Sequence, residues 1–91
     1  MVLPGANPAE IVAQRNLSEA EHRARRAGIT SPKVNLVWGD PAQEIIDAIQ
    51  REKVDAIVVG RRGHGRLSGL LLGSVSQKLT SLAPCVVIVV P

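Results

Sequence analysis

The chain has 91 residues, of which 45% are hydrophobic and 21% are charged, and its formal net charge is +3 at pH 7. These values are typical of one folded globular domain, spanning residues 1–91, and they exclude a disordered chain. A single cysteine excludes an intrachain disulfide, and no apolar run approaches the roughly 20 residues of a membrane span, so we expect a cytoplasmic protein without membrane association.

The first predicted element is a helix that begins at Asn7 and Pro8. Asn7 can cap the helix, Pro8 fits its first position, and Glu10 has the spacing of a capping box. Small apolar residues then recur every three or four positions, which predicts a narrow stripe that can lie close against a sheet. The stripe consists of Ala13, Leu17, Ala20, Ala24 and Ala27. Gly28 predicts the end of the helix.

The next predicted elements are a strand, a helix and a second strand. Residues 33–38 alternate between polar and apolar side chains and predict a strand in which Trp38 packs near the end. Asp40 followed by proline predicts the start of the second helix. Residues 54–59 are almost entirely apolar, which is typical of a central parallel strand covered on both faces.

A helix over residues 74–82 and a strand over residues 85–90 complete the chain, and Pro84 separates them. The order helix, strand, helix, strand, helix, strand favours right-handed crossovers between parallel strands. The expected fold class is therefore α/β, with an open parallel sheet in three layers.

A basic, glycine-rich segment lies between residues 60 and 73. In an open parallel sheet, ligands bind outside the carboxyl ends of the strands, where this segment begins. Its end at Gly73 starts a helix whose free N–H groups and partial positive charge suit a phosphate. The hydroxyls of Ser74 and Ser76 can either cap that helix or donate to a phosphate oxygen.

This segment matches neither of two common nucleotide-binding fingerprints. A P-loop requires a lysine between Gly73 and Ser74, and the dinucleotide pattern requires a glycine where Ser68 stands. The spacing that is present, Gly60-x2-Gly63-x9-Gly73-Ser74, resembles the nucleotide-binding signature of the universal stress protein family.

The resemblance covers nearly the whole chain, including the run over residues 70–76 and the Ala-Pro-Cys before the valine-rich last strand. It implies a Rossmann-like topology and a cytoplasmic stress-response regulator that binds ATP, with or without Mg²⁺. It implies no defined reaction beyond at most a slow ATPase. The phosphate-binding residues that it implies are Gly60, Arg61, Gly63, His64, Gly73, Ser74, Val75 and Ser76.

The chain departs from the family's usual domain at its start. That domain has five strands in the order 3-2-1-4-5, and its first strand ends in an aspartate that helps to bind adenosine. We expect this chain to lack that strand and the first helix, and so to represent the C-terminal two-thirds of the domain. The phosphate half of the site is then present, and the adenine half is not encoded.

The resemblance also implies a homodimer, because the family's last strand commonly pairs with its counterpart. The implied interface residues are Val86, Val87, Ile88, Val89 and Val90. An alternative function is a dimerisation or interaction module that binds no nucleotide. Nucleic-acid binding through Arg61, Arg62, His64 and Arg66 is disfavoured, because Trp38 is the only aromatic residue. No catalytic partner stands at a recognisable spacing from His64.

Overall fold

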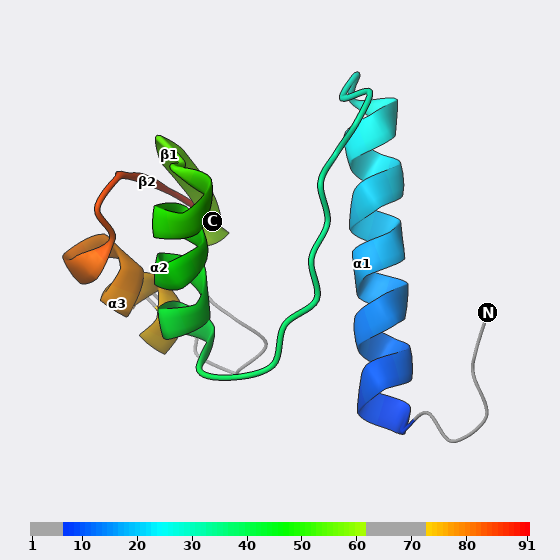
Figure 1. The fold of residues 1–91 in the computed structure, drawn as a ribbon, viewed down its shortest axis with the longest axis horizontal. Helices are drawn as coiled ribbons and strands as arrows, with labels where there is room; N and C mark the ends of the chain where they lie inside the picture. Colours follow the sequence, from blue (N-terminus) through cyan, green and yellow to red (C-terminus); the bar gives the residue numbers. More distant parts are fainter. Residues whose placement is uncertain (1–6, 62–72) are drawn as a thin grey trace. The chain divides into compact units, whose positions relative to one another are not determined.

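The computed structural model describes residues 7–61 and 73–91 and divides into two compact units, Met1–Val37 and Trp38–Pro91. The first unit contains one helix, α1 (Pro8–Arg26) (Figure 1). The second contains, in chain order, α2 (Pro41–Glu52), β1 (Ala56–Gly60), α3 (Ser74–Leu82) and β2 (Val86–Val90). The predicted α/β class, with a parallel sheet, is confirmed.

Both predicted ends of α1 are confirmed. The Asn7 Oδ1 atom accepts a hydrogen bond of 2.8 Å from the backbone N–H of Glu10, as an N-cap does. The helix ends at Arg26, and Gly28 follows with a φ of +103°, a left-handed conformation that costs glycine little. Local side-chain chemistry therefore determines where this helix starts and stops.

The surface of α1 carries two ion pairs at the i, i+4 spacing. Arg23 lies 2.7 Å from Glu19, and Arg25 lies 3.7 Å from Glu21. Such exposed pairs contribute only about 0.3–0.5 kcal/mol each. No described residue of the first unit is buried, and Ala20 of the predicted stripe is exposed. The described part of this unit therefore has no apolar core of its own.

The predicted strand over residues 33–38 is wrong. These residues form no strand, and the sheet of the described chain consists of β1 and β2 alone. Trp38 is 60% exposed, so its predicted packing is wrong as well. An alternating pattern favours an extended backbone, but a strand also needs a neighbouring strand to accept and donate its hydrogen bonds. No described strand pairs with this segment.

The start of α2 matches the prediction. The Asp40 Oδ2 atom accepts a hydrogen bond of 3.1 Å from the N–H of Gln43, and a proline occupies the first turn. An N-cap of this kind stabilises a helix by about 1 kcal/mol. The helix ends before Lys53, whose φ of 53° is left-handed. The N–H of Val54 still donates to Ile49, so the following strand starts at Ala56, later than predicted.

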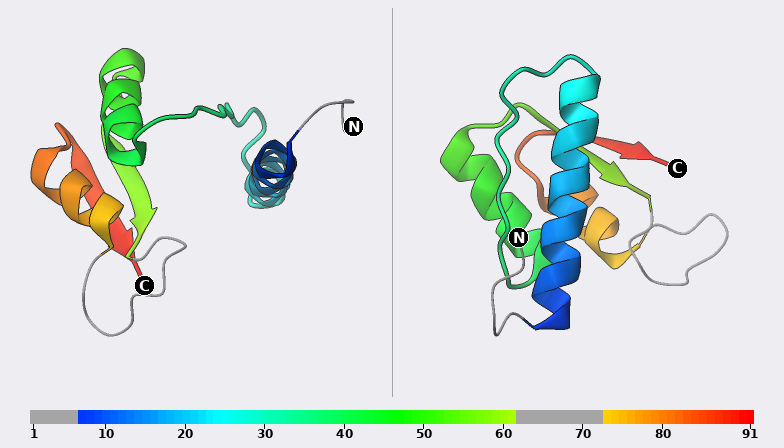
Figure 2. Two further views of the ribbon diagram at one scale, coloured as in Figure 1. Left: turned by 90° about the horizontal axis from the view of Figure 1, so that it is seen from below. Right: turned by 90° about the vertical axis from the view of Figure 1, so that its right-hand side faces the viewer.

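Strands β1 and β2 are parallel, in a register that runs from Ala56 opposite Val86 to Gly60 opposite Val90. Both α2 and α3 lie on one side of this sheet (Figure 2). Side chains on the helix side are half-buried, whereas Val58 on the opposite face is 64% exposed and Val86 is 61% exposed. Within the second unit, the described helices cover one face of β1, and the prediction that both of its faces are covered stays a prediction.

The core of the second unit lies where α2 and α3 pack together and α3 contacts β2. The buried apolar residues among those described are Ala42 and Ile49 from α2 and Leu79 from α3, and the exposed fraction of Leu79 is 0%. The α3 bounds agree with the prediction. This packing holds the start of α3 beside the carboxyl end of the sheet.

Candidate phosphate-binding site

The candidate site lies where β1 ends and α3 begins. Gly60 is the last residue of β1, and Arg61 follows it directly. Gly73 is the N-cap of α3, and the first helical turn begins with Ser74, Val75 and Ser76. Six of the eight predicted residues therefore belong to this junction: Gly60, Arg61, Gly73, Ser74, Val75 and Ser76. The other two, Gly63 and His64, lie outside the described residues.

Arg61 joins three elements through its backbone. Its N–H donates to the carbonyl of Val90 at the end of β2, over 2.6 Å. Its carbonyl accepts two hydrogen bonds, one of 2.7 Å from the N–H of Gly73 and one of 2.8 Å from the hydroxyl of Ser76. We call these contacts among Arg61, Gly73, Ser76 and Val90 the Arg61 network. It connects the ends of both strands to the first turn of α3.

Ser76 contributes to this network from a buried position, with 3% of its surface exposed. Its Oγ atom also lies 3.1 Å from the carbonyl oxygen of Gly73. Sequence reasoning placed Ser76 in the site but missed its bond to Arg61. The two residues are fifteen positions apart, and no local pattern links a serine in a first helical turn to a carbonyl at a strand end.

The N-terminus of α3 has backbone donors that the helix itself does not use. The first hydrogen bond of the helical pattern runs from the N–H of Gln77 to the carbonyl of Gly73, over 2.9 Å. The N–H groups of Ser74, Val75 and Ser76 therefore have no acceptor within the helix. No side chain caps this helix. Such N–H groups, with the partial positive charge of the helix end, favour an anion.

The Arg61 side chain supplies a second kind of donor. Its Nε atom is buried and has no hydrogen-bond partner among the described residues. A buried donor without an acceptor costs about 1–3 kcal/mol, and more when it is charged. An anionic oxygen would satisfy this donor with a charge-assisted hydrogen bond. The junction therefore carries backbone and side-chain donors of the kind that bind a phosphate group.

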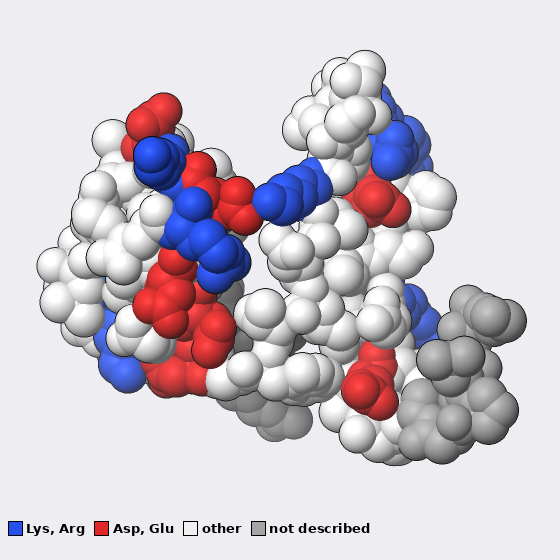
Figure 3. All heavy atoms as spheres, viewed as in Figure 1, with Lys and Arg blue, Asp and Glu red and all other residues white. Residues whose placement is uncertain are grey.

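Acidic side chains gather over α2 (Figure 3), where Glu44, Asp47 and Glu52 belong to the helix. Asp47 accepts a hydrogen bond of 2.9 Å from Gln43, and Glu52 lies 3.8 Å from Arg51. An anion is disfavoured on this helix face. In the second unit, the described surface therefore favours a phosphate at the start of α3 over the outer side of α2.

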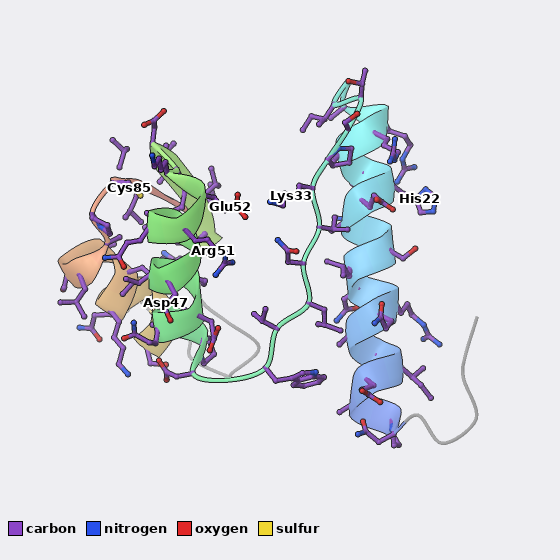
Figure 4. All side chains as sticks on the ribbon, in the orientation of Figure 1. His22, Lys33, Asp47, Arg51, Glu52 and Cys85 are labelled. Atoms are coloured by element: carbon purple, nitrogen blue, oxygen red, sulfur yellow. The ribbon has the colours of Figure 1, made fainter. Side chains whose placement is uncertain are left out.

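Other chemistry-bearing residues are scattered. His22 is exposed on α1, and the thiol of Cys85 lies just before β2, 3.5 Å from the carbonyl oxygen of Val86 (Figure 4). Within residues 7–61 and 73–91, no group of three or more histidine, cysteine or acidic residues could hold a metal ion. Among the helices described, none combines the length and apolarity required to cross a membrane.

Comparison with known proteins gives a consistent result. The model of the universal stress protein family matches residues 3–91. A universal stress protein of Thermus aquaticus, encoded 3′ of a QAH/OAS sulfhydrylase, is 40% identical over 85 residues, which cover 89% of this chain and 62% of that relative. The universal stress protein YxiE of Bacillus subtilis is 36% identical over 81% of this chain and 49% of its own length.

The stress response protein NhaX of Bacillus subtilis is 33% identical over 89% of this chain and 45% of its own length. The chain thus spans about half the length of the curated relatives that it matches. The family model nevertheless covers almost every residue, including both sides of the candidate site. This chain therefore belongs to the universal stress protein family.

Proposed function

We propose that this chain acts in the stress response and binds ATP through its phosphates at the junction of β1 and α3. The observation that carries the proposal is the buried Nε of Arg61, which has no partner within the described residues. It lies in a residue whose backbone is hydrogen-bonded to the start of α3. Membership of the universal stress protein family supports the stress-response role.

The proposed contacts follow from the donors at the junction. The N–H groups of Ser74 and Val75, which have no acceptor within α3, would bind phosphate oxygens, and the exposed side chain of Ser74 would assist. Arg61 would add a charged donor. Gly60 would allow the phosphates to approach the backbone, because it has no Cβ. Gly63 and His64 stay predictions from the family resemblance, as does a bound Mg²⁺.

Titration calorimetry with Mg-ATP tests this proposal on the wild-type chain and on two variants. Arg61→Ala removes the unpaired donor, so we expect the Kd for ATP to rise about tenfold or more, as for the loss of a hydrogen bond to a charged group. Lys78→Ala is the matched control, because it removes one positive charge from an exposed position on α3. The control should change the Kd about twofold or less.

The titration has two results that contradict the proposal. Wild-type protein that gives no heat with Mg-ATP at millimolar concentrations does not bind the nucleotide at a useful affinity. Equal effects of Arg61→Ala and Lys78→Ala would mean that only the net charge matters, and that Arg61 makes no specific contact.

We also propose that the chain forms a homodimer through β2. Within the described sheet, β2 pairs with β1 on one side only. The N–H of Val86 donates to Asp55 and the carbonyl of Val90 accepts from Arg61, so the backbone groups of residues 86, 88 and 90 face β1. Those of Val87 and Val89 face the other edge, where a second copy of β2 could pair.

Sedimentation of two variants at one position tests the dimer. Val87→Pro removes an N–H from the free edge and leaves the groups that face β1 intact, so we expect the dimer Kd to rise about tenfold or more. Val87→Ala shortens the same half-buried side chain and keeps the N–H, so it should stay dimeric. Circular dichroism checks that both variants fold. A wild-type protein that sediments as a monomer even at about millimolar concentration, where weak dimers associate, contradicts the proposal.

A further inference from the structure

Ser76 differs from the other hydroxyl at the start of α3 in its surroundings. Ser74 is exposed, whereas Ser76 is 3% exposed and its Oγ atom lies 2.8 Å from the carbonyl oxygen of Arg61 and 3.1 Å from that of Gly73. Both neighbours are acceptors. A serine hydroxyl has one proton to donate, and the shorter distance places the stronger bond on Arg61.

This arrangement leaves no proton on Ser76 for a phosphate. To donate to a phosphate oxygen, the hydroxyl would have to rotate away from two carbonyl oxygens and become exposed. The carbonyl of Arg61 would keep its bond from the N–H of Gly73, but the link to the first helical turn would be lost. The hydroxyl therefore donates to a backbone carbonyl of the site and not to the ligand.

We infer that Ser76 is a positioning residue of the proposed ATP site. Its hydroxyl ties the Arg61 carbonyl to α3 and so sets where the Arg61 side chain and the N–H groups at the start of the helix stand relative to each other. The inference rests on the proposed function, because it assigns Ser76 a role in phosphate binding without contact to phosphate. The two serines then have different roles. Ser74 contacts the phosphate, and Ser76 holds the Arg61 side chain and the helix N–H groups in position.

The Arg61 network explains why one hydroxyl has this influence. Two hydrogen bonds join Arg61 to the start of α3, from the N–H of Gly73 and from the hydroxyl of Ser76. Without the hydroxyl, the 2.7 Å bond from Gly73 is the only one left between the Arg61 carbonyl and α3 within the described residues. With a single bond, the end of β1 can rotate relative to α3. The Arg61 side chain then moves away from the N–H groups at the start of the helix.

Three variants of the full chain test this role: Ser76→Ala, Ser76→Thr and Ser74→Ala. The first readout is amide hydrogen exchange by NMR without nucleotide, at the N–H of Gly73 and at the N–H of Ala83. Ala83 donates to Leu79 over 2.9 Å at the far end of α3 and reports on the stability of the helix as a whole. The second readout is the Kd for Mg-ATP.

We expect Ser76→Ala to accelerate exchange at Gly73 about tenfold with little change at Ala83, since the loss of one bond is local. Its Kd for ATP should rise about fivefold to tenfold. Ser76→Thr keeps a hydroxyl that can donate to the carbonyl of Arg61, so it should restore both values to within about threefold. Ser74→Ala should weaken ATP binding and leave exchange at Gly73 unchanged.

Several results would overturn the inference, and each has a different meaning. If Ser76→Ala weakens ATP binding without changing Gly73 exchange, Ser76 contacts the phosphate directly. Equal acceleration at Gly73 and Ala83 would mean that the serine only stabilises the fold. Unchanged ATP affinity would remove its role in binding. If the wild type binds no ATP, the proposed function fails and the positioning role fails with it, while Gly73 exchange still tests the hydrogen bond itself.

Discussion

Replacement of Leu79 by alanine is expected to lower the free energy of unfolding by about 2–5 kcal/mol. Leu79 has an exposed fraction of 0% and is the largest fully buried side chain among the described residues. Its helix, α3, packs against both α2 and β2, so the cavity would open at the centre of the second unit. Small domains have only about 5–15 kcal/mol of stability, so this change removes a large part of it.

Urea denaturation followed by circular dichroism measures the effect. Leu82→Ala is the matched control, because Leu82 ends the same helix and is 64% exposed. It should change the free energy of unfolding by about 0.5 kcal/mol or less. Similar effects of the two substitutions would show that Leu79 is not buried in solution and would contradict the packing of α3 described above.

The second large effect is expected for Gly39→Ala, which should cost about 1–3 kcal/mol. Gly39 precedes the N-cap of α2 and has a φ of +149°, in a region that side chains rarely adopt. An added Cβ would also lie 2.6 Å from the Oε1 atom of Glu44. The Glu44 side chain is flexible at that end and can move, so the backbone strain accounts for most of the cost.

The double variant Gly39→Ala/Glu44→Ala distinguishes the backbone strain at residue 39 from the contact between its added Cβ and the Glu44 side chain. With the Glu44 side chain removed, the backbone strain persists, so we expect the double variant to lose at least as much stability as Gly39→Ala alone. The same urea denaturation measures it. A double variant that regains the wild-type stability would show that the contact with Glu44, and not the φ angle, makes glycine necessary there.

The helix ends could be predicted because their signals are local. Asn7 and Asp40 each cap the N–H three residues ahead, and Gly28 ends α1 with a positive φ. Each of these devices needs only neighbouring residues, so sequence spacing is sufficient to recognise it. The bounds of α3 also agree with the prediction, in which Pro84 supplied the local signal at the end of the helix.

The strands could be predicted only in part, because a strand depends on residues that are distant in the sequence. Residues 33–38 have the alternating pattern of a strand but pair with none of the described strands. The apolar run at Val58 predicts burial on both faces, and the described helices of the second unit leave its side chain 64% exposed. Composition indicates that a residue can be buried, and only the packing of helices decides which face is covered.

The candidate site also has features that could be predicted from the sequence and features that could not. The resemblance to the family's glycine spacing led to the prediction that Gly60 and Gly73 lie at one site, and the structure brings Arg61, the residue after Gly60, into hydrogen-bond contact with Gly73. The roles within that site were not predictable. The bond from Ser76 to Arg61 depends on how α3 packs beside the end of β1, and no sequence pattern indicates that the Nε of Arg61 has no partner among the described residues.

The register of the sheet has a consequence for how this chain folds. Ala56 pairs with Val86, so parallel pairing closes a loop of about 30 residues before it yields any stabilisation, and distant pairings of this kind are slow to form. The bond between Arg61 and Ser76 spans half that distance. If it forms first, it shortens the loop that remains to be closed. Contacts between the end of β1 and the start of α3 therefore close a shorter loop, at a lower entropic cost, than the pairing of β1 with β2.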